Sequence, residues 1–177
     1  NLTVDSEIVA ETVVLTAKES SDTTKGDSIL VNFAVSATGT PTASDGEHKK
    51  GGIYIYAGDD VTVPEGVTVT AASDLVIAGD VDSTDDDGAD IVIEGILKAQ
   101  AGSITLRGGV DDDTITTSEG SLVNARDITI LGQGGGDKVI LDGPTTATDT
   151  LKIDGGAGAS EIEINEVASG ASAVVIQ

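Results

Sequence analysis

Four short apolar segments recur at nearly constant spacing in the C-terminal half of the chain: Ile104-Thr105-Leu106, Ile128-Thr129-Ile130, Leu151-Lys152-Ile153 and Val174-Val175-Ile176. The steps between them are 24, 23 and 23 residues. The first and third residue of each segment are apolar, which is the period of a β-strand with one buried side. A second strand follows each of the first three segments after a glycine-rich turn: Thr114-Ile115-Thr116, Val139-Ile140-Leu141 and Ile162-Glu163-Ile164.

This repeating unit predicts an all-β fold, a parallel β-helix (β-solenoid) with about 23 residues per coil in the C-terminal half. One coil cannot bury its apolar face alone, so coils must stack, with strands of neighbouring coils about 4.8 Å apart. A Thr/Ser/Gly/Ala segment such as 142–148 is expected to be an irregular return. We expect seven or eight coils, with Ile104, Ile128, Leu151 and Val174 in one inward stack and Leu106, Ile130, Ile153 and Ile176 in another.

The chain is expected to form a single solenoid over residues 1–177, most regular over 104–177. Earlier steps are uneven: Leu75 to Ile91 is 16 residues and Ile91 to Ile104 is 13. Either these coils are shorter or these segments belong to different sides of the coil. Residues 36–50 lack an apolar pattern and are predicted to be a protruding loop. The absence of the i, i+3, i+4, i+7 pattern argues against helices.

Composition excludes several classes of function. The 177 residues carry 31 acidic and nine basic side chains, a net charge of -22, so phosphate backbones and anionic membrane surfaces would repel the chain. Membrane insertion is not expected, because no apolar run approaches 18 residues. There is no cysteine and one histidine, which leaves no thiolate or multi-histidine metal site. A first residue other than Met suggests a piece of a longer protein.

Three related units end a strand with glycine: Ser73-Asp74-Leu75-Val76-Ile77-Ala78-Gly79, Ala89-Asp90-Ile91-Val92-Ile93-Glu94-Gly95 and Arg126-Asp127-Ile128-Thr129-Ile130-Leu131-Gly132. In these units, residues 51–177 resemble the parallel β-helix regions of large bacterial surface proteins, of the filamentous-haemagglutinin and autotransporter-passenger kind. The resemblance implies an extracellular, cell-surface stalk or adhesive fibre that is structural and not an enzyme.

The glycine turns resemble the calcium-binding nonapeptide of RTX proteins, G-G-x-G-x-D-x-(apolar)-x. The segment 108–116 matches except at its fourth position, 132–140 except at its second, and 155–163 has Ser160 in place of Asp. If calcium is a cofactor, this resemblance implies Asp111, Asp113 and Asp137 as its ligands, with a cation bridging the last two. The other interpretation is a polar glycine turn that keeps the rod soluble.

A second candidate calcium site lies in the acidic stretch 82–90. Counted from Ser83, Asp85, Asp87 and Glu94 fall at positions 3, 5 and 12 of an EF-hand-type loop, where hard oxygen ligands are needed. Ser83 and Asp90 depart from that pattern, and flanking helices are not expected. The alternative is again a solvated turn.

Three functions remain open at this level: a structural segment of a bacterial surface fibre or adhesin, a polysaccharide-acting β-helix enzyme, and a calcium-loaded RTX-like spacer. Tyr54 and Tyr56 share one strand face and either stack on a sugar ring or make a capping or core contact. Val174-Val175-Ile176 is a strand without a polar cap after it, so we expect further coils or other copies of the chain to dock end to end. A surface polysaccharide is a second expected partner.

Overall fold

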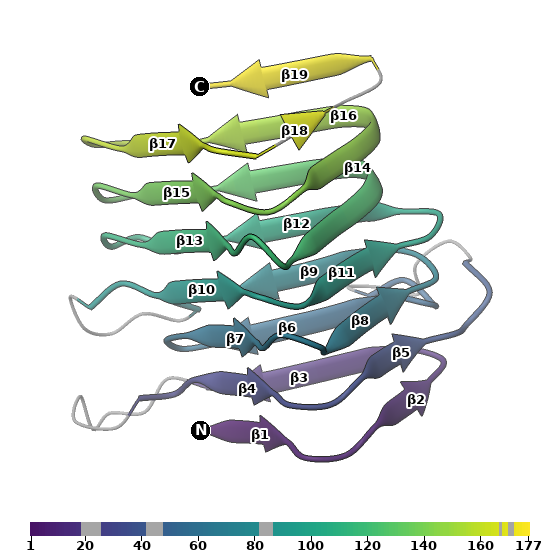
Figure 1. The fold of residues 1–177 in the computed structure, drawn as a ribbon. Coiled ribbons are helices and arrows are strands. Elements are labelled where there is room, and N and C mark those ends of the chain that lie inside the picture. Colours follow the sequence, from purple (N-terminus) through teal and green to yellow (C-terminus); the bar gives the residue numbers. More distant parts are fainter. Residues whose placement is uncertain (19–25, 42–47, 82–86, 167, 170–171) are drawn as a thin grey trace.

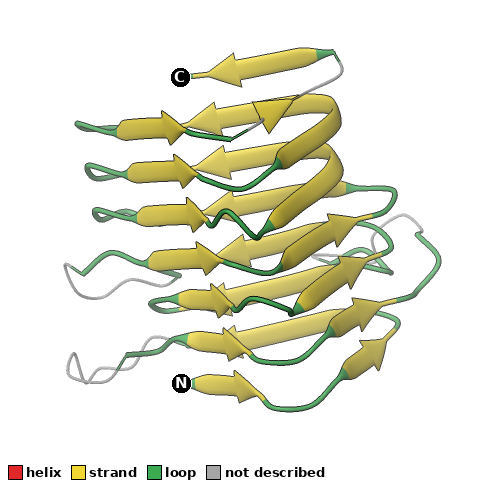
Figure 2. Ribbon diagram, in the orientation of Figure 1, coloured by secondary structure: helices red, strands yellow, loops and turns green. Residues whose placement is uncertain are grey.

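The computed structural model describes residues 1–18, 26–41, 48–81, 87–166, 168–169 and 172–177. It shows a parallel β-solenoid of about six turns, built from strands, turns and loops (Figures 1 and 2). Each coil contributes three strands, and every strand pairs in parallel with the equivalent strand of the next coil. The predicted fold class is therefore confirmed. Within the described residues, no helix is long and apolar enough to cross a membrane.

The first face is a sheet in which seven described strands stack. In order they are β1 (Leu2–Val4), β4 (Ile29–Val31), β7 (Val61–Val63), β10 (Asp90–Ile93), β13 (Thr114–Thr117), β15 (Lys138–Leu141) and β17 (Glu161–Ile164). Six steps of about 4.8 Å separate the first layer from the last, which gives a rod about 29 Å long.

The second and third faces share one larger sheet. The second face contains β2 (Ile8–Ala10), β5 (Val35–Ala37), β8 (Thr68–Ala71), β11 (Ile96–Ala99), the first halves of β14 (Leu122–Leu131) and β16 (Thr145–Asp154), and β18 (Ala168–Ser169). The third contains β3 (Val13–Ala17), β6 (Ile53–Ala57), β9 (Leu75–Ala78), β12 (Ser103–Arg107), the second halves of β14 and β16, and β19 (Ala173–Ile176). The β14–β16 register shifts between Ala125 and Asp127, where the strands bend from one face into the other.

Three sequence expectations need correction. Seven or eight coils were expected, whereas the solenoid has about six turns. The return at 142–148 was expected to be irregular, yet its residues from Thr145 onward belong to β16 and form the third side of the coil. The alternation of apolar and polar residues is hard to see in the first half of β16, because its inward residues are Thr145 and Ala147. The segment 36–50 begins inside β5, so the loop is shorter than predicted; residues 42–47 lie outside the described part.

The uneven early spacing has a simple origin. Ile91 lies in the first face, whereas Leu75 and Ile104 pair with one another in the third. Along the first face, stacked residues are 27, 32 and 30 positions apart in the first three steps, then 24, 24 and 23. The longer coils carry their additional residues in the connections between β3 and β4, β5 and β6, and β9 and β10.

The core is a set of inward ladders that run along the rod. Ile104 pairs with Ile128, Ile128 with Leu151, and Leu151 with Val174, as predicted. The parallel ladder of Leu106, Ile130, Ile153 and Ile176 is also confirmed. Side chains of the middle layers in both ladders are fully buried, whereas those of β19 are exposed because no strand covers them in the structure.

Candidate functional site

A column of aspartates runs along the edge where the third face turns into the first. In successive coils, the residue two positions before the first inward residue of the first-face strand is Asp27, Asp59, Ala89, Asp113, Asp137 and Ser160. We call Asp27, Asp59, Asp113 and Asp137 the aspartate ladder. Asp27, Asp113 and Asp137 are buried, unlike most carboxylates in proteins.

Three carboxylates of the ladder accept a hydrogen bond from a backbone N–H of the coil below. Asp137 Oδ1 accepts from the Asp113 N–H (3.0 Å), and Asp113 Oδ1 accepts from the Ala89 N–H (2.7 Å). Asp59 Oδ2 accepts from the Asp27 N–H in the same way. The carboxylates therefore satisfy backbone N–H groups that the glycine turns leave without a strand partner.

The glycines of the repeat serve the same arrangement. Asp113 Oδ2 accepts from the Gly109 N–H of its own turn (2.5 Å). A Cβ at Gly108 would lie 2.1 Å from Asp113 Oδ2, and one at Gly132 would lie 2.2 Å from Asp137 Oδ2. The Gly–Asp spacing is thus explained by a side chain folding back onto its own turn. In the last of these turns Ser160 takes the position, and its hydroxyl donates to the Gly155 carbonyl (2.8 Å).

Burial makes the upper part of the ladder costly to ionise. It raises the pKa of Asp113 to about 6, and the neighbouring charges of Asp80 and Asp137 act in the same direction against two backbone hydrogen bonds. Burial also raises the pKa of Asp137, with a smaller contribution from Asp112. Among the described residues, Asp137 Oδ2 has no hydrogen-bond partner.

Asp27, Asp59 and Asp80 were not expected from the sequence. The first two carry a readable signal, an aspartate two positions before an inward first-face residue. Asp80 is buried at φ 46°, and its Oδ2 accepts from the Val110 N–H of the next coil (2.7 Å). It leaves no periodic signal because it occupies this role in one coil.

The structure divides the predicted calcium ligands among separate places. Asp111 is half-buried in the glycine turn, whereas Asp113 and Asp137 occupy consecutive rungs of the ladder. Asp85 lies outside the described residues. Strand β10 separates Asp87 from Glu94, so these two carboxylates lie at different corners of the coil. In the described part of the chain, no three acidic or histidine side chains converge as a metal site.

The fit of the ladder to calcium is also poor chemically. Both oxygens of Asp113 and one of Asp137 face backbone N–H groups, which present positive charge where a cation would bind. Calcium prefers six to eight oxygen ligands. Calcium binding by Asp111, Asp113 and Asp137 stays a prediction, and the geometry assigns the two buried carboxylates a structural role.

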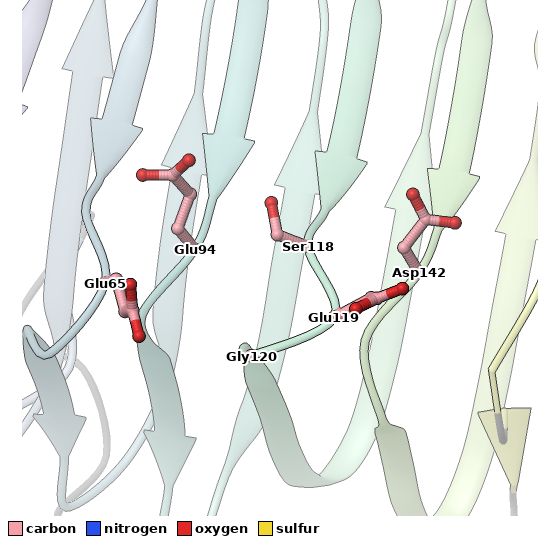
Figure 3. Close-up of a pocket in the computed structure, with 6 residues that line it drawn as sticks. All are labelled: Glu65, Glu94, Ser118, Glu119, Gly120 and Asp142. Carbon is pink, nitrogen blue, oxygen red and sulfur yellow. The ribbon is translucent and has the colours of Figure 1, made fainter.

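A groove at the opposite end of the first-face strands gathers four carboxylates (Figure 3). It is lined by Glu65, Glu94, Ser118, Glu119, Gly120 and Asp142. Glu65 and Glu119 lie on turns two coils apart that are closed by the hydrogen bonds Val67 N–H to Pro64 O and Ser121 N–H to Ser118 O. Glu94 lies at the same corner of the coil between those two, and Asp142 at the same corner of the coil after Glu119. At both places the connection between the two strands is shorter.

The lining of the groove contains neither a basic nor an aromatic side chain among the described residues. It therefore offers a negative surface to cations. It lacks the rings on which a sugar could stack.

No known protein family, curated protein or solved structure matches this chain.

Proposed function

We propose that the chain is a structural segment of an extracellular bacterial surface fibre or adhesin, in which copies of the chain dock end to end and continue the solenoid. The observation that carries the proposal is the state of the last layer. Leu151 and Ile153 of β16 are 0% exposed, whereas Val174 and Ile176, which stack on them in β19, are 48% and 53% exposed. Because each side chain is already about half buried, covering the rest stabilises by roughly 1 kcal/mol per side chain.

The backbone of β19 supports the same proposal. Gln177 donates to the Ile153 carbonyl and accepts from the Gly155 N–H, so alternation along the strand directs the amides of Val174 and Ile176 away from β16. These groups form an edge onto which another parallel strand can add. At the other end, Leu2 donates to Ser28 O and Val4 O accepts from Asn32, which leaves Thr3 of β1 directed away from β4.

Charge favours growth along the axis over lateral association. The chain carries a net charge of -22, and the flank of the rod displays the four carboxylates of the groove. Rods lying side by side would repel at low ionic strength, whereas end-to-end contact buries apolar side chains and pairs strand edges. The absence of cysteine allows such a segment to fold without disulfide chemistry.

The enzyme alternative receives less support from the arrangement of the side chains. Glycan-cleaving sites combine paired carboxylates with groups that hold the sugar. Here the grouped carboxylates of the groove lie at the corner between the first and second faces, whereas the tyrosines lie on the third face. A structural role accordingly explains the carboxylates better than catalysis does.

Sedimentation velocity at moderate salt, over a wide range of protein concentration, tests the proposal. We expect the wild-type chain to form longer species as its concentration rises. Ile176→Glu should remain monomeric, since it places a charge on the inward edge. Val175→Glu is the matched control, because Val175 faces outward beside Lys152 and should leave assembly intact. A wild-type chain that stays monomeric throughout would refute end-to-end docking of copies.

A second assay addresses catalysis directly. After incubation with anionic polysaccharides, we expect neither new reducing ends nor unsaturated ends. Their release would replace the structural proposal with the enzyme alternative.

A further inference from the structure

Aromatic and basic side chains gather on the outer surface of the third face. Tyr54 and Tyr56 both point outward from β6, and residues 48–50 fold back across the first of them. The Tyr54 hydroxyl accepts from the Lys49 N–H (2.8 Å), and Tyr54 as a whole is only 4% exposed. The His48 ring meets Tyr54 edge-on at 4.3 Å, and the two tyrosine rings stack at 6.5 Å. Tyr54 is therefore buried under the segment 48–50 on the outer surface and belongs neither to the core nor to a cap of the rod, whereas Tyr56 stays half-buried at the surface.

Beside Tyr56 lies an open hollow of about 460 Å³, within the size range of small-molecule sites. It is lined by Val14, Thr16, His48, Tyr56, Val81 and Arg107. A second hollow of about 450 Å³ shares Val14 and His48 and is lined further by Thr12 and by the ion pair of Glu11 with Lys50. The two form a track across the third face with His48 between them.

Arg107 gives this track an available positive charge. In the outward ladder, Tyr56 pairs with Ala78 and Ala78 with Arg107, so the guanidinium belongs to a strand two layers, or about 9.6 Å, from the tyrosine. Lys49 forms an ion pair with Asp74 (2.6 Å) and Lys50 with Glu11 (3.8 Å). Among the described residues, Arg107 has no ion-pair partner, in a chain whose net charge is -22.

We propose that this track binds an acidic oligosaccharide, with a sugar ring stacked on Tyr56 and a sugar carboxylate held by Arg107. The inference adds a ligand class to the proposed surface role. An aromatic face with a guanidinium nearby suits a ring that carries both C–H groups and a carboxylate. Thr16 and His48 supply the further polar groups that sugar hydroxyls need.

An extended peptide fits this surface less well. Strand β6 pairs with β3 on one side and β9 on the other, and β9 pairs with β12. The backbone of this face is therefore already hydrogen-bonded, which removes strand addition as a way of binding. Recognition has to come from the side chains of the track.

Calorimetric titration of the dilute, monomeric chain with a short oligogalacturonate tests the proposal. We expect saturable binding, and weaker binding of a neutral maltooligosaccharide of equal length. Arg107→Gln should weaken oligogalacturonate binding at least about tenfold, since a charged hydrogen-bond pair is lost. Tyr56→Leu should weaken it several-fold through loss of the stacked ring.

Two matched controls are available within the chain. Arg126→Gln removes the chain's other arginine, which pairs with Asp127 (2.7 Å), and Phe33→Leu removes an exposed aromatic ring away from the track. Both should bind like the wild type. Equal losses in Arg107→Gln and Arg126→Gln, equal affinity for the neutral sugar, or equal affinity for an oligoglutamate peptide would overturn the proposal. Because binding is measured on the monomer, its failure leaves end-to-end assembly untouched.

Discussion

Ile130→Ala tests whether the inward ladders hold the solenoid together. Ile130 is fully buried and stacks on Leu106 in one neighbouring coil and Ile153 in the other. The change deletes three carbons, and at about 0.8 kcal/mol for each buried carbon the lost transfer free energy is about 2.4 kcal/mol. The cavity adds to this, because two flanking layers fixed by strand pairing cannot close over it fully. We expect a total loss of about 3–4 kcal/mol in the free energy of unfolding.

Thr129→Ala is the matched control for this measurement. Thr129 is adjacent in sequence but lies in the outward ladder between Thr105 and Lys152, so its truncation should cost well under 1 kcal/mol. Urea denaturation followed by circular dichroism at fixed pH and protein concentration gives both values. Similar losses for the two variants would refute the assignment of inward and outward faces.

Further predictions concern the aspartate ladder. Burial raises the folded-state pKa of Asp137, so protonation stabilises the wild-type fold at low pH and that contribution is lost as the pH rises. The stability of Asp137→Asn relative to the wild type should therefore be greater at pH 7.5 than at pH 4. Asp113→Asn should instead destabilise at neutral pH, because its amide would face the Gly109 N–H with a donor; thermal melts of both variants at the two pH values would show the contrast, and equal behaviour would contradict it. Calcium should leave the wild-type melting midpoint unchanged, and a rise that Asp137→Asn abolishes would instead establish a calcium site.

The sequence predicted the fold where its repeat is regular. From residue 104 onward, two-residue alternation and a step of 23 or 24 residues located two of the three faces and both inward ladders correctly. The second-face strand was missed in the last coils because its inward positions alternate weakly: they are Val123 and Ala125 in β14, and Thr145 and Ala147 in β16. A tightly packed corner selects small side chains there, which only the three-dimensional packing reveals.

The candidate site was only partly predictable. The Gly–Asp spacing correctly marked Asp113 and Asp137 as special, but sequence does not distinguish a carboxylate that binds a cation from one that accepts backbone N–H bonds. Asp59 could have been found by asking which residue precedes each inward strand position. The track beside Tyr56 was out of reach, because Arg107 is brought near it by stacking across two coils.

End-to-end continuation of the solenoid is tested most directly by amide hydrogen exchange, measured by NMR on dilute and concentrated samples of the chain. The amides of Thr3, Val174 and Ile176 are directed toward the open ends of the rod, whereas the Gln177 amide already donates to Ile153. We predict that exchange at the first three slows as the concentration rises, and that exchange at Gln177 changes little. Exchange at Thr3, Val174 and Ile176 that is equally fast in both samples would contradict the account.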